Sequence, residues 1–250
     1  MKKGRTFLVV ALGIALVGCG GSAPKQPEKP AYSPTFDYTP PSTAAPNSAQ
    51  VTVAVVSPQF PDGEWFRHYP FSQLRDNMGK DLVELLNARG YTVKGPFKSR
   101  DEMTYSDKEG SDLILVPDMD MTVRNAVTPK GRGLLNIWHL VGTIETQGQL
   151  NLSLIEPLSA EKMWTKNVAL PPKSVSVVSD KSWFKANDVP SQYENYVYDD
   201  KKIRNALGPS LEDSYKEIME ATWKHLDPKE LASVKEETKK LRDKIRFQAR

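Results

Sequence analysis

Hydrophobic and polar positions change their period several times along the chain, and each change predicts a new element. A β-branched run at 51–56 predicts a buried strand that Ser57-Pro58 closes. A helix is predicted from about Pro70 to Ala88, with Gly90 ending it, because apolar residues recur there at three- and four-residue steps. These apolar residues are Leu74, Met78, Leu82, Leu85 and Leu86. The segment 91–93 then predicts a second strand.

The middle of the chain predicts three further strands. Residues 112–123 begin fully apolar and then alternate, which is typical of a strand buried on both faces at its start and half-exposed at its end. Residues 143–156 alternate clearly, with Leu152 on one face and Asn151 on the other, and 162–168 form a hairpin partner. Prolines and glycines predict a loop over 124–140, and 171–198 reads as irregular.

The C-terminal part is predicted to be helical, with a break and restart at Asp227-Pro228. The fold class is therefore α/β (α+β). We expect a mixed sheet of about four to six strands, one helix after the first strand, and long C-terminal helices.

The N-terminus has the pattern of a lipoprotein signal. Lys2, Lys3 and Arg5 precede an uncharged apolar run of 7–17, which is too short to cross the ~30 Å hydrocarbon core of a bilayer. The run ends in Leu16-Val17-Gly18-Cys19, which resembles the lipobox of bacterial lipoproteins, and Cys19 is the one cysteine of the chain. We expect cleavage after residue 18, lipidation of Cys19, and anchoring in a membrane. Gly20 stands where an inner-membrane retention signal has Asp, so we expect the outer membrane, with its periplasmic or surface face left open.

Domain boundaries follow from composition. Residues 1–18 are the signal peptide, and 19–50 are the lipidated Cys with a tether that holds seven prolines and is expected to be extended and unfolded. In the alternative, Tyr32, Phe36 and Tyr38 pin part of it onto the domain. An α/β domain is expected over 51–226 and a basic helix over 227–250.

Charge and composition exclude several classes of function. Removing 1–18 takes three of the 34 basic residues, which leaves 31 against 31 acidic ones, so the neutral mature chain is not expected to bind nucleic acid. With one Cys and three widely spaced His, the sequence does not predict a metal site. Asp118 and Asp120 are explained by the solvated face of a strand. Glu84, Glu145 and Glu156 form no acid–base pair in sequence, and nucleophile, zinc and phosphate-loop motifs are absent. We expect no enzyme, catalytic residue, metal or cofactor.

Three groups of residues are candidates for contact with a ligand or partner. Exposed aromatic rings stack on sugars or anchor proteins, while arginine and lysine pair with carboxylates such as that of sialic acid. A basic helix end suits an acidic partner or lipid headgroups. For the three groups, the alternatives are core packing, a solvated loop and a solvated helix end. The candidates are Trp183, Tyr193, Tyr196 and Tyr198; Arg124, Lys130 and Arg132; and Lys239, Lys240, Arg242, Lys244 and Arg246.

The order of motifs over 51–245 resembles the neuraminyllactose-binding hemagglutinin family of bacterial surface lipoproteins. Besides the lipobox and the first strand, the matching stretches are 85–93 (LLNARGYTV), 156–161 (EPLSAE), 202–207 (KIRNAL) and 239–242 (KKLR). The resemblance implies a lipid-anchored adhesin that binds a host glycan or a protein. The family's basic sialic-acid motif is poorly matched at 125–132 (NAVTPKGR), so a sialylated glycan is only weakly implied.

Two functions follow as hypotheses. The first is a non-enzymatic outer-membrane lipoprotein of this adhesin-like family. The alternative is a structural lipoprotein of an envelope-spanning secretion or flagellar complex, in which the C-terminal helix docks an envelope protein.

Overall fold

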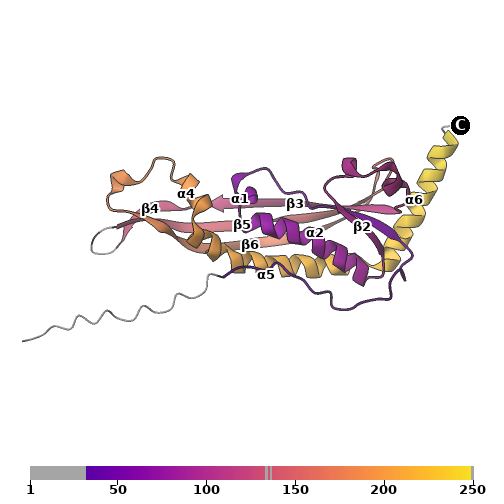
Figure 1. Cartoon of the computed structure of the whole chain (residues 1–250), viewed down its shortest axis with the longest axis horizontal. Coiled ribbons are helices and arrows are strands. Elements are labelled where there is room, and N and C mark those ends of the chain that lie inside the picture. Colours follow the sequence, from indigo (N-terminus) through magenta and orange to yellow (C-terminus); the bar gives the residue numbers. More distant parts are fainter. Residues whose placement is uncertain (1–31, 133–134, 136, 249–250) are drawn as a thin grey trace, which may run out of the picture. The chain divides into compact units, whose positions relative to one another are not determined.

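A mixed β-sheet forms the centre of the structure, a computed structural model that describes residues 32–132, 135 and 137–248 (Figure 1). Its strands are β1 (Thr52–Val56), β2 (Thr92–Phe97), β3 (Leu113–Asn125), β4 (Thr128–Arg132), β5 (Ile137–Ile155) and β6 (Lys162–Trp183). The helices are α1 (Glu64–Arg67), α2 (Phe71–Ala88), α3 (Tyr105–Glu109), α4 (Glu194–Asp199), α5 (Lys201–His225) and α6 (Pro228–Gln248). Short 3₁₀ turns lie at Arg100–Glu102 and Ala186–Asp188. The predicted fold class, with a mixed sheet and long C-terminal helices, is confirmed.

The order of the strands is β2-β1-β3-β5, with β6 on the other edge of β5. β1 pairs in parallel with β2 and β3, whereas β3, β5 and β6 are antiparallel neighbours. β4 continues along the same edge of β5 where β3 ends. At this junction a Cβ on Gly142 would lie 2.2 Å from the carbonyl oxygen of Ala126, so only glycine fits there.

One face of the sheet carries the core, because α2 and α5 contact each other and pack on this face (Figure 1). The apolar stripe predicted for α2 is buried as expected, and Gly90 ends the helix with a φ of +83°. α5 and α6 are separated at Asp227-Pro228, as predicted. Leu231 and Val234 of α6 belong to the same core, so the domain does not end at residue 226.

The expectation of an unfolded tether is wrong for residues 32–50. Phe36 is fully buried and packs edge-on against Tyr215, with ring centroids 5.6 Å apart. Thr35 donates a hydrogen bond to Glu212, and the backbone N–H of Tyr38 donates one to Asp81. We call residues 32–50 the strap, because they lie along α2 and α5 as part of the compact unit 32–250. Residues 1–31, with Cys19, lie outside the described residues.

The loop predicted over 124–140 is also wrong, because most of it forms β4 and the first part of β5. Similarly, 171–183 continues β6 instead of being irregular. Pro129 lies in β4, and Pro171 and Pro172 lie where the β5–β6 register shifts opposite Gln147. β4 and β6 each pair with β5 alone among the described strands, so a missing proline N–H is tolerated on their outer edge.

Candidate functional site

The end of the sheet formed by β4, β5 and β6 brings together parts of two predicted groups. Trp138 of β5 lies opposite both Gly131 and Trp183, and the next row places Lys130, His139 and Ser182 across the same three strands. Lys130 and the aromatic segment, which are distant in sequence, therefore share one end of the sheet. We call this place the aromatic end, defined by Trp138, Trp183, Phe184, Tyr193 and Tyr196.

Most aromatic rings of the aromatic end contact a neighbour, whereas the ring of Phe184 is largely exposed to solvent. Trp183 and Tyr196 pack edge-to-face with centroids 6.0 Å apart, and Lys181 Nζ lies 4.0 Å from the Tyr196 centroid. Tyr193 is half-buried against the core, whereas Phe184 exposes 81% of its surface. The core-packing alternative therefore holds in part for Trp183, Tyr193 and Tyr196.

Two predicted contact residues lie apart from this end. Tyr198 packs edge-on against Trp65 with centroids 4.9 Å apart, so it serves the core. Arg124 is exposed on the outer face of the sheet and lies opposite Glu145, which offsets its charge. The side chain of Arg132 lies outside the described residues. The structure thus does not assemble a basic cluster from Arg124 and Lys130.

Among the predicted contact residues of the C-terminal helix, Arg242 is tied to the domain itself. Arg242 donates hydrogen bonds to the carboxylate of Glu156 and to the carbonyl of Ser111, so its guanidinium is engaged within the domain. Lys239, Lys240 and Lys244 are exposed, and the side chain of Arg246 lies outside the described residues.

The face of the sheet turned away from α2 and α5 carries a row of polar side chains that the sequence alone did not combine into a candidate site. Asp118, Asn151 and Asn167 lie opposite one another on β3, β5 and β6. In the next row Val116, Ser153 and Thr165 repeat this alignment. Together with Gln59, Ile155 and Lys162, these residues line a shallow groove of about 490 Å³, which we call the outer groove.

Amides, hydroxyls and one carboxylate in the outer groove offer both donors and acceptors at spacings fixed by the strands. An array of this kind suits a ligand rich in hydroxyl groups. The signal in the sequence was the polar side of the alternating strand, where Asn151 and Ser153 alternate with leucines.

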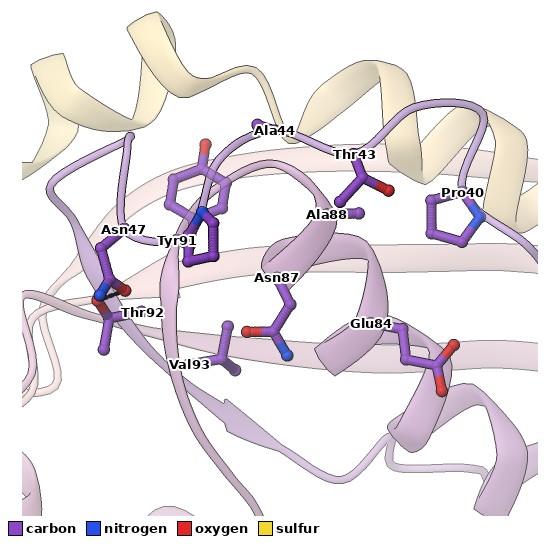
Figure 2. A pocket seen from close by; sticks show the side chains of 11 residues that line it. Pro40, Thr43, Ala44, Asn47, Glu84, Asn87, Ala88, Tyr91, Thr92 and Val93 are labelled. Atoms are coloured by element: carbon purple, nitrogen blue, oxygen red, sulfur yellow. Dashed lines mark hydrogen bonds between the residues drawn. The ribbon is translucent and has the colours of Figure 1, made fainter.

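A second groove lies between the strap and the end of α2 (Figure 2). It has a volume of about 670 Å³ and is lined by residues of the strap, α2 and β2. Asn47 accepts a hydrogen bond from Thr92 across it, as the dashed line in Figure 2 shows. Glu84 is the one charged residue of its lining, so this groove does not suit an anionic sugar.

Two buried carboxylates are tied up by internal partners. Burial raises the pKa of Asp81, although Tyr215 Oη donates to it at 2.6 Å and the N–H of Tyr38 at 2.9 Å. Burial would also raise the pKa of Glu156, but hydrogen bonds from Ser159 and Arg242 outweigh it and the pKa is lowered. Both groups therefore serve structure.

The described part of the chain shows neither a cluster of metal ligands nor a helix suited to span a membrane. Within it, no three His, Cys, Asp or Glu residues gather as a metal ion would require. In the same residues, none of the helices combines the length and apolar composition that crossing a bilayer demands.

Comparison with known proteins places the fold. The chain matches no protein-family model and no curated protein. A lipoprotein from Neisseria meningitidis matches at 14% identity over 60% of this chain and 93% of its own, but its TM-score of 0.26 is too low to support an inference. A neuraminyllactose-binding hemagglutinin homolog from Helicobacter pylori matches at 17% identity over 84% of this chain and 100% of its own, with a TM-score of 0.59. The described domain therefore has the fold of that hemagglutinin homolog.

Proposed function

We propose that this chain is a non-enzymatic outer-membrane lipoprotein, anchored through Cys19, whose domain binds a glycan in the outer groove. The row of Asp118, Asn151 and Asn167 carries the proposal, because it presents hydrogen-bonding groups on an open sheet face. The fold shared with the hemagglutinin homolog supports a binding role of the same kind.

The chemistry of the outer groove favours a neutral glycan over a sialylated one. Asp118 would repel the carboxylate of sialic acid, and Lys162 is the one cation of the lining. Amide side chains hydrogen-bond sugar hydroxyls in both directions, as donor and as acceptor. We therefore expect neutral sugars to bind in preference to sialylated ones.

A glycan array probed with the processed chain, residues 19–250, tests the binding role. Asn151→Ala and Asn167→Ala should each weaken binding to the best neutral glycan about tenfold, because each removes hydrogen bonds to the sugar. Asn87→Ala is the matched control, since Asn87 is an exposed amide in the second groove, between the strap and the end of α2. If Asn87→Ala weakens glycan binding and Asn151→Ala does not, the assignment of the binding site to the outer groove is contradicted.

The anchor is tested separately by mass spectrometry of the mature N-terminus. A Cys19 carrying a diacylglycerol and an acyl chain is expected, and Cys19→Ala should abolish lipidation because the chain has no other thiol. An unmodified Cys19, or cleavage elsewhere, would refute the lipoprotein role. Stoichiometric envelope proteins recovered by cross-linking, together with a silent glycan array, would instead support the alternative role in an envelope complex.

A further inference from the structure

The described chain begins near the aromatic end. Tyr32 and Pro34 lie against Gly208 of α5, where an added Cβ would be 3.0 Å from the Tyr32 ring and 3.1 Å from Pro34. Gly208 is seven residues from Lys201, the first residue of α5, which corresponds to about 10 Å of helix. Tyr32, the first described residue, therefore lies within about two turns of the start of this helix.

The start of α5 is itself tied to the aromatic end. Asp200 caps the helix by accepting hydrogen bonds from the N–H groups of Lys202 and Ile203. The same carboxylate accepts hydrogen bonds from the N–H groups of Asp180 and Lys181 in β6. From here α5 runs for 25 residues, about 37 Å, before α6 begins (Figure 1). Tyr32, where the described residues begin, thus lies nearer to the aromatic end than to α6, which follows the far end of α5.

The distance to an anchored membrane is limited by the chain itself. Thirteen residues lead from Cys19 to Tyr32, and a fully extended chain of that length spans at most about 45 Å. If Cys19 holds the lipid, as proposed above, the bilayer surface lies within this reach of the point where the strap begins.

The surface of the aromatic end has the chemistry of a membrane interface. Phe184 directly follows Trp183 at the end of β6, and Leu135 lies between the paired ends of β4 and β5. They expose 81% and 79% of their surface. Trp and Tyr rings favour the boundary between headgroups and acyl chains, and lysine side chains extend beside them to the headgroups. Lys130, Lys181 and Lys185 are exposed here. The exposed Asp180 and Asp188 offset part of this charge, so apolar insertion is the larger contribution.

We propose that the aromatic end docks on the bilayer that holds the lipid of Cys19, with Phe184 inserted among the headgroups. The docked domain then meets the membrane at two points, the acyl chains and this end. α6 points away from the bilayer, where its exposed lysines remain accessible.

Sedimentation with vesicles of phosphatidylethanolamine and phosphatidylglycerol tests this docking. The protein is the processed chain 19–250 carrying Cys19→Ala, so acyl chains do not contribute and the result is independent of whether Cys19 is lipidated in the cell. The chain should co-sediment, and Phe184→Ala should lower partitioning about tenfold because a large exposed ring no longer inserts. Lys181→Gln should lower it up to about fivefold in low salt.

Tyr105→Ala provides the matched control, because Tyr105 of α3 is another exposed aromatic residue, 66% accessible, outside the aromatic end. It should leave partitioning unchanged. Absence of co-sedimentation, or equal partitioning of the parent and the Phe184→Ala chain, would overturn the docking proposal while leaving the anchor and the outer groove to their own tests.

Discussion

Arg242 Nε donates a hydrogen bond of 2.5 Å to Glu156 Oε1, and this contact joins two residues that are 86 positions apart. Glu156 is fully buried, and its other oxygen accepts from the N–H groups of Leu158 and Ser159. The guanidinium also donates to the carbonyl of Ser111 at 2.9 Å. Arg242, a candidate for partner contact in the sequence, therefore holds α6 against the turn after β5.

Arg242→Ala should destabilise the domain. Removing one member of a buried pair leaves an uncompensated carboxylate, and the two N–H donors that Glu156 keeps reduce this cost to about 2–3 kcal/mol. Chemical denaturation measures the free energy of unfolding. Lys240→Ala removes an exposed charge of the same helix and should change it by less than about 0.5 kcal/mol. Equal effects of the two changes would show that the pair with Glu156 contributes no stability.

Stability should fall in acid through Glu156. Because its pKa in the folded protein is below the ordinary value of 4.5, the ionised group stabilises the fold above that value. This contribution is lost as the pH falls below about 4.5 and through the lowered pKa. The free energy of unfolding of Glu156→Gln, measured from pH 6 downward, should therefore decline less steeply than that of the parent. Parallel slopes would contradict the assigned pKa.

The Asp81 carboxyl should change the stability with pH in the direction opposite to Glu156. Its raised pKa means that the folded protein holds this proton more tightly than the unfolded chain does. The resulting stabilisation is fully present below the ordinary value of 3.8 and is lost as the pH rises through the raised pKa. In Asp81→Asn, denaturation curves collected upward from pH 3 should lack this loss. Tyr215→Phe keeps the Asp81 carboxylate but removes the hydroxyl that donates to it. The pKa of Asp81 should therefore be higher in this variant than in the parent.

Local patterns predicted most elements because each depends on nearby residues. The stripe from Leu74 to Leu86 determines α2, and the alternation of 113–123 determines which side chains of β3 face the helices. Proline misled the prediction at Pro129, Pro171 and Pro172, since the cost of a missing N–H depends on whether the strand lies at an edge. Edge position is a property of the assembled sheet and cannot be read from a window of sequence.

The candidate site was predicted only in part for the same reason. Lys130 and Trp183 meet because β5 pairs with β4 and β6, and this register is set by the whole sheet. Glu156 and Arg242 lie on separate elements whose contact depends on the docking of α6. The outer groove escaped notice because Asn151 and Asn167 become neighbours only through the β5–β6 pairing.

The two faces of β5 should respond very differently to a carboxylate. Leu152 is fully buried against the helices, whereas its neighbour Asn151 faces the outer groove. Leu152→Asp should prevent folding, because a buried unpaired carboxylate costs several kcal/mol. Asn151→Asp should leave the circular dichroism spectrum unchanged and lower the melting temperature only slightly. Similar losses in both variants would mean that the strand is assigned to the wrong face.

The strap should contribute to stability although its composition suggests a linker. Phe36 is fully buried against Tyr215, and truncating a buried phenylalanine typically costs about 3–5 kcal/mol. Phe36→Ala should therefore lower the free energy of unfolding by about this amount. Asp37→Ala, at an exposed neighbouring position, is the control and should have little effect.

A chain that starts at residue 49 loses Phe36 as well as the hydrogen bonds to Asp81 and Glu212, so it should be less stable than Phe36→Ala. Equal melting temperatures of that shortened chain and the processed chain would show that residues 32–48 are a passive tether.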